Sequence, residues 1–293
     1  MEIDDYVTFL REDLTRKIYL KPYLGNSGDG LIWMGNEFLF QELGISRARL
    51  PQEADLILWP GGNPTMWQGN LDGWQECWKR WPQVPFGIGP ATFQTGCLPW
   101  ATLLKESPTA VHAAFARDRE SHSVLQNAGL PKTIYLGLAH DPAFHLRGSD
   151  WLATQRQAST SDFVLASFRS DHEGVSEAKW NQRMGGVPGI QWIQNRLNRK
   201  RAHERLLARV ESVKNRCGND DQIIVEDVSS HSFDLFVERV RHARQVHTDR
   251  LHCMILALML DKKVFAYQTS YRKLEAVSEF SLSQWGRIEF VNE

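Results

Sequence analysis

The sequence predicts an α/β protein whose strands form doubly wound parallel sheets. Short apolar runs alternate with helical segments along most of the chain, and the turns after these runs repeatedly contain glycine. In sheets of this kind, ligands bind at the carboxyl ends of the strands. The length of 293 residues fits two domains of ordinary size or one large domain, and 11 tryptophans can help to fill a substantial core.

The first half of the chain is expected to supply one parallel sheet. Its predicted strands cover residues 17–24, 55–59, 84–90, 111–116 and 132–138. Helices are expected at residues 31–43 and from about residue 122 to the glycine at 129. Residues 67–81 are polar, hold four tryptophans and are expected to be partly helical. These rings could stack on sugars, but packing in the core is favoured.

The second half is expected to supply a second sheet. Residues 146–162 are polar, rich in Ser and Thr and without periodicity, so they are interpreted as a linker between domains at residues 1–150 and 160–293. The predicted strands cover residues 163–168, 222–227, 243–246, 263–268 and 287–291. Helices are expected at residues 192–216, 233–241 and 253–260, and another opens at residues 269–274; residues 173–187 are expected to form a loop or short helix.

The composition argues against nucleic acid as a partner and against a membrane-spanning segment. The net charge of -1 provides no global basic field for nucleic acid, and the basic segment 192–216 is interpreted as a solvated helix face rather than an RNA- or lipid-binding surface. The four cysteines form no C-x-x-C pair, which fits a reducing cytoplasm. The acidic start lacks the order of a signal peptide, and apolar runs of about eight residues are too short to cross a bilayer. We expect a soluble, cytoplasmic protein without a transmembrane segment.

The chain is organised around the stretch from His247 to His252, which precedes the apolar run 253–260. That run has no polar face and predicts a helix buried all round. Thr248 or Asp249 is the expected N-cap, because each offers a side-chain oxygen to the first turn. A helix N-terminus favours an anion, so Arg250 beside it predicts a phosphate or carboxylate site where His252 could move protons. The alternative is a structural Asp249–Arg250 ion pair beside a packed His252.

Further cations follow other predicted strands of the second half. Arg169 comes after strand 163–168, and Arg272 and Lys273 come after strand 263–268. If the sheet is parallel, these side chains can converge beside His252. Several cations at one helix N-terminus suit a small polyanion that carries a carboxylate and a phosphate.

Glycine turns mark a second set of candidates in the first half. Residues 25–30 join a strand to a helix but lack the G-x-G-x-x-G order of a dinucleotide site. A ligand-facing role of this turn is favoured over a purely structural one, because Asn26 and Asp29 stand beside its glycines, Gly28 among them. Gly62 and Asn63 occupy the glycine turn after strand 55–59.

These motifs resemble those of the polysaccharide pyruvyltransferase family. The matching segments are Gly25-Asn26-Ser27-Gly28-Asp29-Gly30-Leu31-Ile32 for G-N-x-G-D-x-L-I, Arg117-Asp118-x-Glu120-Ser121 for R-D-x-x-S, Asp141-Pro142-Ala143-Phe144 for D-P-A-F, Thr248-Asp249-Arg250-Leu251-His252 for T-D-R-L-H, and Tyr271-x-Lys273. They stand in family order over about residues 20 to 275. Each motif alone is weak, and five in order are a strong signal.

The resemblance implies two Rossmann-like domains that face a cleft, in a GT-B-like architecture. It implies transfer of the carboxyvinyl unit of phosphoenolpyruvate to a sugar diol of an exopolysaccharide or cell-wall glycan precursor, which leaves a pyruvate ketal and phosphate. His252, Arg250 and Lys273 are then the catalytic candidates, and the donor-binding candidates are Arg169, Arg250, Leu251, His252 and Lys273. The acceptor-side candidates are Asn26, Gly28, Asp29, Gly62 and Asn63.

Phosphoenolpyruvate would be a co-substrate, and no cofactor is expected. The expected partner is a glycan or lipid-linked oligosaccharide, so a peripheral membrane contact stays open. No metal site is expected, because His247 and His252 lack the i,i+4 spacing of a zinc motif. Two other functions share this fold: a glycosyltransferase with a nucleotide-sugar donor, and a non-catalytic glycan- or anion-binding protein. Release of phosphate or of nucleotide separates the two enzymes, and ligand-induced thermal stabilisation without turnover would indicate the binding protein.

Overall fold

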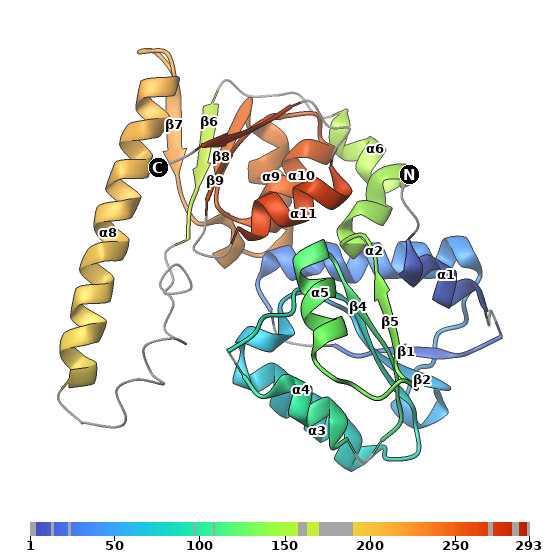
Figure 1. Ribbon diagram of the computed structural model, residues 1–293. Coiled ribbons are helices and arrows are strands. Elements are labelled where there is room, and N and C mark those ends of the chain that lie inside the picture. The colour runs from blue at the N-terminus through green and yellow to red at the C-terminus, as the bar shows by residue number, and fades with distance from the viewer. Residues whose placement is uncertain are drawn as a thin grey trace. The chain divides into compact units, whose positions relative to one another are not determined.

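The chain folds as two compact units. The computed structural model describes residues 4–12, 15–22, 25–96, 98–107, 109–157, 163–169, 190–268, 272–282 and 287–291, with side chains left undescribed at 190–199 and 201–202 (Figure 1). The first unit comprises Met1–Gly25, Asp29–Ser149 and Ala276–Ser283, and the second comprises Asn26–Gly28, Asp150–Glu275 and Gln284–Glu293. A short segment of each half of the chain therefore groups with the other half.

The first unit is built on a five-stranded parallel sheet. Its strands, in spatial order, are β1 (Ile18–Leu20), β2 (Leu56–Trp59), β3 (Phe86–Ala91), β4 (Val111–Ala116) and β5 (Tyr135–Leu138). Ile18 also forms an isolated parallel bridge with Arg47 on the edge of β1 that faces away from β2. The chain thus steps first to one side of β1 and then to the other, which is the doubly wound order with its switch point beside β1.

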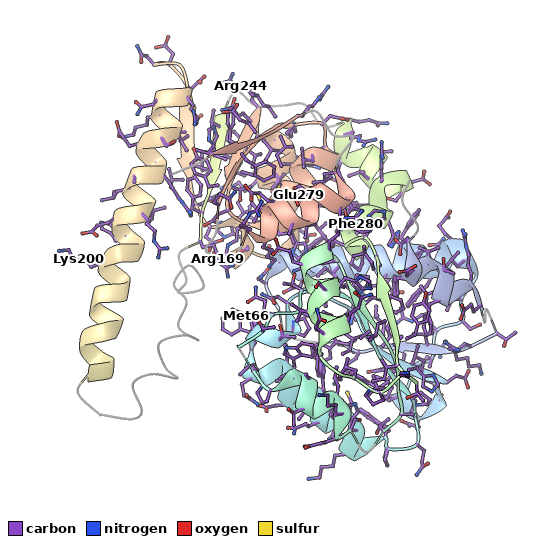
Figure 2. The ribbon with its side chains drawn as sticks, viewed as in Figure 1. Met66, Arg169, Lys200, Arg244, Glu279 and Phe280 are labelled. Atoms are coloured by element: carbon purple, nitrogen blue, oxygen red, sulfur yellow. The ribbon has the colours of Figure 1, made fainter. Side chains whose placement is uncertain are left out.

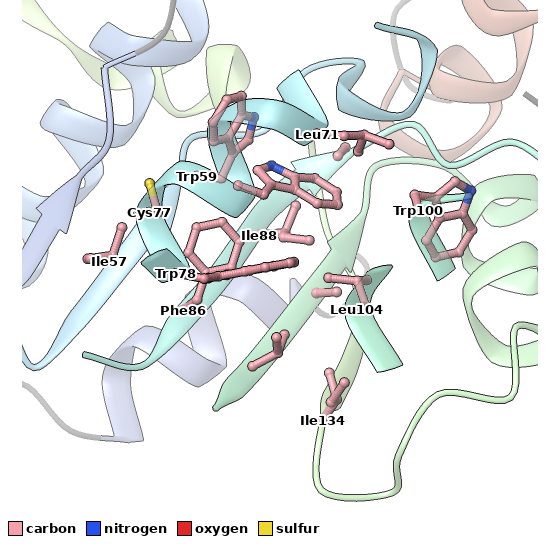
Figure 3. Packing of buried hydrophobic residues seen from close by; sticks show 14 of the residues in the cluster. Ile57, Trp59, Leu71, Cys77, Trp78, Phe86, Ile88, Trp100, Leu104 and Ile134 are labelled. Atoms are coloured by element: carbon pink, nitrogen blue, oxygen red, sulfur yellow. The ribbon is translucent and has the colours of Figure 1, made fainter. Parts of the chain in front are cut away.

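Helices cover both faces of this sheet. They are α1 (Asp5–Glu12), α2 (Ser27–Leu43), α3 (Gln68–Arg80), α4 (Trp100–Lys105) and α5 (Arg119–Asn127), with 3₁₀ turns at Pro51–Glu53, Pro64–Met66 and Pro142–Gly148. One face packs Tyr6 and Phe40 of α1 and α2 against Leu58 and Phe115. The other face packs side chains from α3, α4 and α5 against alternate residues of the same strands (Figure 3). Alternation along each strand sends side chains to opposite faces, so both faces are apolar.

The tryptophans of α3 behave as predicted. Trp74 and Trp78 are buried in the core with Trp59 and Phe86. Figure 3 shows Trp59, Trp78 and Phe86 in this core. Their rings meet edge-on or tilted, as in the 6.2 Å contact between the Trp59 and Trp74 centroids. Trp67, just before the helix, is the exposed member of the group, at 51%.

The second unit repeats the winding of the first. Its parallel strands, in spatial order, are β10 (Ile288–Val291), β9 (Lys263–Tyr267), β8 (Gln245–Thr248), β6 (Phe163–Ser167) and β7 (Gln222–Val225). The helices are α6 (Asp150–Arg156), α8 (Ile190–Arg216), α9 (Phe233–His242) and α10 (Leu251–Met259), with a 3₁₀ turn at Val228–Ser230. Helix α11 (Lys273–Ser281) begins in this unit, and its residues from Ala276 onward group with the first unit. Helix α8 covers one face, and α9 and α10 cover the other (Figure 1). The strand order reverses between β6 and β8.

The two parallel sheets confirm the predicted α/β class with Rossmann-like winding. Several boundaries differ from expectation. The segment predicted as a linker holds the end of the Pro142–Gly148 turn and helix α6, and helices α1 and α4 were not predicted. Helix α2 begins at Ser27, so Gly28 and Asp29 lie in its first turn rather than in a loop. The predictions for residues 173–187 and for Tyr271 lie outside the described residues.

No helix among the described residues is long and apolar enough to span a membrane.

Candidate functional site

The candidate site lies at the carboxyl ends of β6, β7 and β8 in the second unit. These strands flank the point where the strand order reverses, which is where parallel α/β sheets bind ligands. Strand β8 extends to Thr248, so the predicted strand end at residue 246 is two residues too early and His247 and Thr248 belong to the strand. The turn that follows is Asp249-Arg250, and α10 begins directly after it.

Thr248 shapes this turn. Its Oγ1 donates a hydrogen bond to the Ser167 carbonyl at 2.8 Å and accepts one from the Arg250 N–H at 2.9 Å. The expectation that Thr248 or Asp249 would be the N-cap is wrong, because Arg250 occupies that position without a side-chain cap. Thr248 instead ties the end of β6 to the start of α10.

Helix α10 is buried along its whole length, as its apolar sequence predicts. Every residue from Leu251 to Met259 is buried, and Arg250 and His252 each retain 9% exposure. Leu251 is an apolar core residue, so it can meet a ligand only through its backbone at the helix N-terminus. The first turn of α10 therefore holds a guanidinium and an imidazole at the edge of an apolar core.

Arg250 is held by a carboxylate that the sequence analysis did not identify. Its Nε donates to Asp227 Oδ1 at 3.1 Å, and its Nη2 donates to Asp227 Oδ2. Asp227 follows strand β7 and also accepts from the N–H and Oγ of Ser229. Because two parallel hydrogen bonds fix the guanidinium plane, Arg250 is oriented before any ligand arrives.

Asp249 pairs with a different cation. Its Oδ2 accepts from Arg209 Nη1 of α8 at 2.5 Å, and its Oδ1 accepts from the Arg169 N–H at 2.9 Å. Burial raises the pKa of Asp249, and the charges of Arg209 and Arg250 oppose that shift. The alternative of an Asp249–Arg250 ion pair is therefore wrong. Asp249 is paired with Arg209, and Arg250 is paired with Asp227.

The start of α2 lies against the same turn. Asn26 Oδ1 accepts from the Gly28 N–H at 2.8 Å, and Ser27 Oγ donates to the Val228 carbonyl at 3.2 Å. A Cβ added to Gly28 would stand 2.8 Å from both Cβ and Nδ1 of His252. Glycine at position 28 is thus what allows this backbone to approach the imidazole closely.

The other acceptor-side candidates belong to the first unit. Gly62, at φ +91, donates from its N–H to the Pro90 carbonyl at 3.1 Å. Asn63 follows it, and both polar atoms of its side chain are buried without a hydrogen-bond partner in the described part of the chain. The Asp29 side chain lies against Gly25, because a Cβ added to Gly25 would stand 2.1 Å from Oδ2 of Asp29.

The remaining donor-side candidates follow neighbouring strands of the second sheet. Arg169 lies just after β6 (Figure 2), and Lys273 is half-buried at the first position of α11, after β9. Since β6, β8 and β9 are adjacent and parallel, Arg169, Arg250 and Lys273 follow strand ends at one edge of the sheet. Arg272 is exposed, and its Nε donates to Glu275 Oε2 at 2.6 Å. This contact lies on the exposed surface of α11.

The Cys253 thiol and the His247 imidazole lie near this turn, and burial keeps both uncharged at neutral pH. Burial raises the pKa of the Cys253 thiol to about 12, which leaves it protonated and a poor nucleophile at neutral pH. His247 stacks on Phe265 at 4.4 Å, and burial lowers its pKa to about 3. Its Nδ1 lies 3.1 Å from Tyr267 Oη and its Nε2 lies 2.6 Å from Gln245 Nε2. The neutral ring fits these neighbours, with Nε2 as acceptor and Nδ1–H as donor.

His247 makes stability depend on pH. In the unfolded chain its imidazole titrates near pH 6.5, whereas in the fold it stays neutral down to about pH 3. The unfolded state therefore binds more protons than the folded state between these pH values. The contribution of His247 to the protein's free energy of unfolding is highest above about pH 6.5 and falls as the pH drops. From about pH 7.5 to about pH 5 we expect a loss of about 2 kcal/mol from this residue. Urea unfolding of the wild type and of His247→Gln at both pH values measures it. An equal pH dependence in the two proteins would contradict the assignment.

Two motifs of the first unit form a buried network. Arg117 and Asp141 are fully buried, and Arg117 Nη1 donates to Asp141 Oδ2 at 2.7 Å. Arg117 Nε donates to Thr92 Oγ1 at 2.9 Å. Asp118 caps α5 by accepting from the N–H and Oγ of Ser121. The R-D-x-E-S segment, which follows β4, and the D-P-A-F turn, which follows β5, are thus joined by the buried Arg117–Asp141 ion pair.

A family model for polysaccharide pyruvyl transferases matches residues 4–271. The chain belongs to the polysaccharide pyruvyl transferase family. Among curated proteins, none matches the chain. A solved structure of a functionally uncharacterized protein from Klebsiella pneumoniae subsp. pneumoniae NTUH-K2044 is similar over 99% of this chain and 98% of that one, with 18% identity and a TM-score of 0.65. At this identity, that likeness shows the fold.

For this pyruvyl transferase family member, the sequence analysis missed Asp227 and Arg209. Asp227 is the last residue of the predicted strand 222–227, so attention to charged side chains at strand ends, which identified Arg169, would also have found it. Arg209 was interpreted as part of a solvated basic face, yet it is 9% exposed. It lies three residues after Leu206 and four before Val213, two apolar residues that pack on the sheet. That helical spacing is the signal that places Arg209 on the buried face.

Among the described residues, no group of three or more His, Cys, Asp and Glu side chains could hold a metal ion.

Proposed function

We propose that this protein transfers the carboxyvinyl unit of phosphoenolpyruvate to two hydroxyls of a sugar in a polysaccharide precursor. The observation that carries the proposal is the first turn of α10, which places Arg250 and His252 together at the carboxyl edge of a parallel sheet in a chain of this family. Guanidinium, imidazole and free backbone N–H groups at one helix N-terminus suit a ligand that carries a carboxylate and a phosphate.

The proposed reaction balances with two hydroxyls and one phosphoenolpyruvate. The methylene carbon gains a proton and becomes a methyl group, the neighbouring carbon bonds to both sugar oxygens, and the bond from that carbon to the phosphate oxygen breaks. The two hydroxyls lose one proton each, of which one goes to the methyl group and the other to the departing phosphate. The products are a cyclic pyruvate ketal and inorganic phosphate.

Each donor-side residue has a proposed part in this reaction. Arg250, oriented by Asp227, binds the donor carboxylate together with Arg169. Lys273 and the N-terminal N–H groups of α10 stabilise charge on the departing phosphate. His252 moves a proton to or from the reacting atoms, because a histidine can serve as both acid and base near neutral pH.

The acceptor-side roles are proposed from position. Asn26 and Gly28 lie at the start of α2 beside His252, so they are proposed to border the sugar that reacts. Asp29, Gly62 and Asn63 lie in the first unit and are proposed to bind the acceptor there. The Asn63 amide can donate through Nδ2 and accept through Oδ1, which suits a sugar hydroxyl that both accepts and donates.

The test is a transfer assay with purified protein. Phosphoenolpyruvate is supplied with a panel of lipid-linked and nitrophenyl sugars, and both free phosphate and the mass of each sugar are followed. We expect phosphate release that depends on the sugar, together with a product heavier by one ketal-linked pyruvate. A parallel panel of nucleotide sugars serves as the rival arm. Nucleotide release there, without reaction of phosphoenolpyruvate, would overturn the proposal in favour of a glycosyltransferase.

The contact at Gly28 yields a prediction for this assay. Gly28→Ala adds a Cβ that would stand 2.8 Å from His252 Cβ, so either α2 or the imidazole must shift. We expect turnover to fall roughly tenfold while stability drops by about 1–3 kcal/mol, the usual cost of overpacking. Gly69→Ala is the matched control, because nothing lies within 4 Å of its added Cβ. Equal turnover in the two variants would show that the close approach has no role.

A further inference from the structure

Arg209 joins strand ends that are distant in the sequence. It lies in the C-terminal half of α8, and its guanidinium packs near the rings of Phe168 and Tyr267, at 5.5 and 5.9 Å from their centroids. Nη1 donates to Asp249 Oδ2 at 2.5 Å, and Nη2 donates to the Gln268 carbonyl at 2.8 Å. Two nitrogens of one guanidinium therefore bind residues that follow two neighbouring strands, β8 and β9.

A third strand end is joined through Asp249. The carboxylate that accepts from Arg209 through Oδ2 also accepts from the Arg169 N–H through Oδ1 at 2.9 Å. Arg169 follows β6, so the bridge Arg209–Asp249–Arg169 crosses from α8 over β8 to β6. From each of these three strand ends the chain leads into a donor-side candidate: Arg169 itself, Arg250, and Lys273.

We infer that Arg209 is a positioning residue for the donor, which sets the spacing of the three strand ends that bind phosphoenolpyruvate. This inference rests on the proposed function. Arg209 acts through Asp249 and Gln268, and it is not assigned a contact with the donor. The carboxylate and phosphate of the donor are a fixed distance apart, so cations on separate strand ends must keep their separation for both groups to be bound.

A simpler role for Arg209 would be to neutralise the buried Asp249. Any single cation within hydrogen-bond distance of its carboxylate could do that, and no contact with the next strand would be needed. The geometry instead uses the planar fork of arginine, with one nitrogen on a carboxylate and another on a carbonyl of the next strand. A lysine ammonium is a compact charge on a flexible stem and does not reproduce this fork. Arg209→Lys therefore keeps a positive charge beside Asp249 but removes the contact that joins Asp249 to the Gln268 carbonyl.

The primary experiment compares Arg209→Lys with the wild type in the phosphate-release assay. Lysine keeps a cation beside Asp249, so the fold is expected to stay intact, with its urea unfolding midpoint close to that of the wild type. Loss of the second contact is expected to raise the KM for phosphoenolpyruvate about tenfold, with kcat changed less than about threefold. The thermal stabilisation by phosphoenolpyruvate should weaken in parallel. Lys200→Met, an exposed position on the same helix (Figure 2), is the matched control and should keep both constants.

A second variant tests the bridge from its other side. Asp249→Asn keeps an oxygen for the Arg169 N–H but removes the charge that Arg209 binds, so it should also raise the KM for phosphoenolpyruvate. Because both changes cut one bridge, the double variant Arg209→Lys/Asp249→Asn should raise KM by less than the product of the single effects. Wild-type KM in both single variants, or fully multiplicative effects, would overturn the inference.

Failure of the proposed function gives a different result. If wild-type protein neither releases phosphate from phosphoenolpyruvate nor is stabilised by it, the donor assignment is wrong, and the positioning role falls with it. If the wild type reacts and Arg209→Lys is indistinguishable from it, the function stands and only the inference about Arg209 is wrong.

Discussion

His252→Ala is expected to reduce turnover by about 10²–10⁴-fold, the usual contribution of a positioned acid–base group. The affinity for phosphoenolpyruvate should change much less, because the proposed donor contacts come from Arg169, Arg250 and Lys273. His252 lies in the first turn of α10, 9% exposed, with Gly28 against its ring. Steady-state kinetics with varied phosphoenolpyruvate would separate the effects on kcat and KM.

The control for this variant is another histidine of the second unit. His203 lies exposed on α8, and His203→Ala should leave both constants unchanged. A urea unfolding curve of His252→Ala guards against a loss of activity that comes from loss of fold. Turnover within about threefold of the wild type would remove the acid–base role, whereas a rise in KM with normal kcat would make His252 a binding residue.

The largest expected loss of stability follows from removal of one partner of the Arg117–Asp141 pair. Both side chains are fully buried, so Asp141→Ala leaves a guanidinium in the core without its carboxylate. Such losses cost about 3–5 kcal/mol, because the remaining charge is neither hydrated nor paired. Asp141 Oδ1 also accepts from the Ala143 N–H at 3.0 Å, so the cap of the following 3₁₀ turn is lost as well. The free energy of unfolding in urea measures the total.

Two comparisons test the cause of that loss. The double variant Arg117→Met/Asp141→Leu removes both charges and should recover part of the stability, since no unpaired charge remains. Glu76→Ala breaks an exposed pair with Arg80 and should cost less than about 1 kcal/mol. A double variant that is no more stable than Asp141→Ala would contradict the assignment of the loss to the unpaired charge of Arg117.

The fold could be predicted from the sequence because its signals are local. Short apolar strands that alternate with helices, and glycine turns at their carboxyl ends, reflect burial of both faces of a parallel sheet. Strand β4 begins and ends where the pattern predicts, at Val111 and Ala116, and the apolar run after His252 is a helix buried all round. Periodicity carries this information because neighbouring residues of one element face fixed directions.

The partners of the charged residues were not predictable in the same way. Asp249 and Arg250 are adjacent in sequence, which suggested a pair, yet their partners are Arg209 and Asp227, which lie 40 and 23 residues away. The side chains of adjacent residues at a turn point in different directions, so each meets whatever element packs on its own side. The boundary of β8 was missed for a related reason, because His247 is polar in sequence but neutral and stacked in the core.

The sequence by itself determined the class of fold, the family motifs and the residues that can carry acid–base and anion-binding chemistry. Those properties depend on residue type and short-range spacing. Only the tertiary structure decided that Asp227 orients Arg250, that Arg209 joins three strand ends, and that Gly28 lies against His252. These are contacts between segments far apart in the chain, and the packing of helices on the sheet selects them.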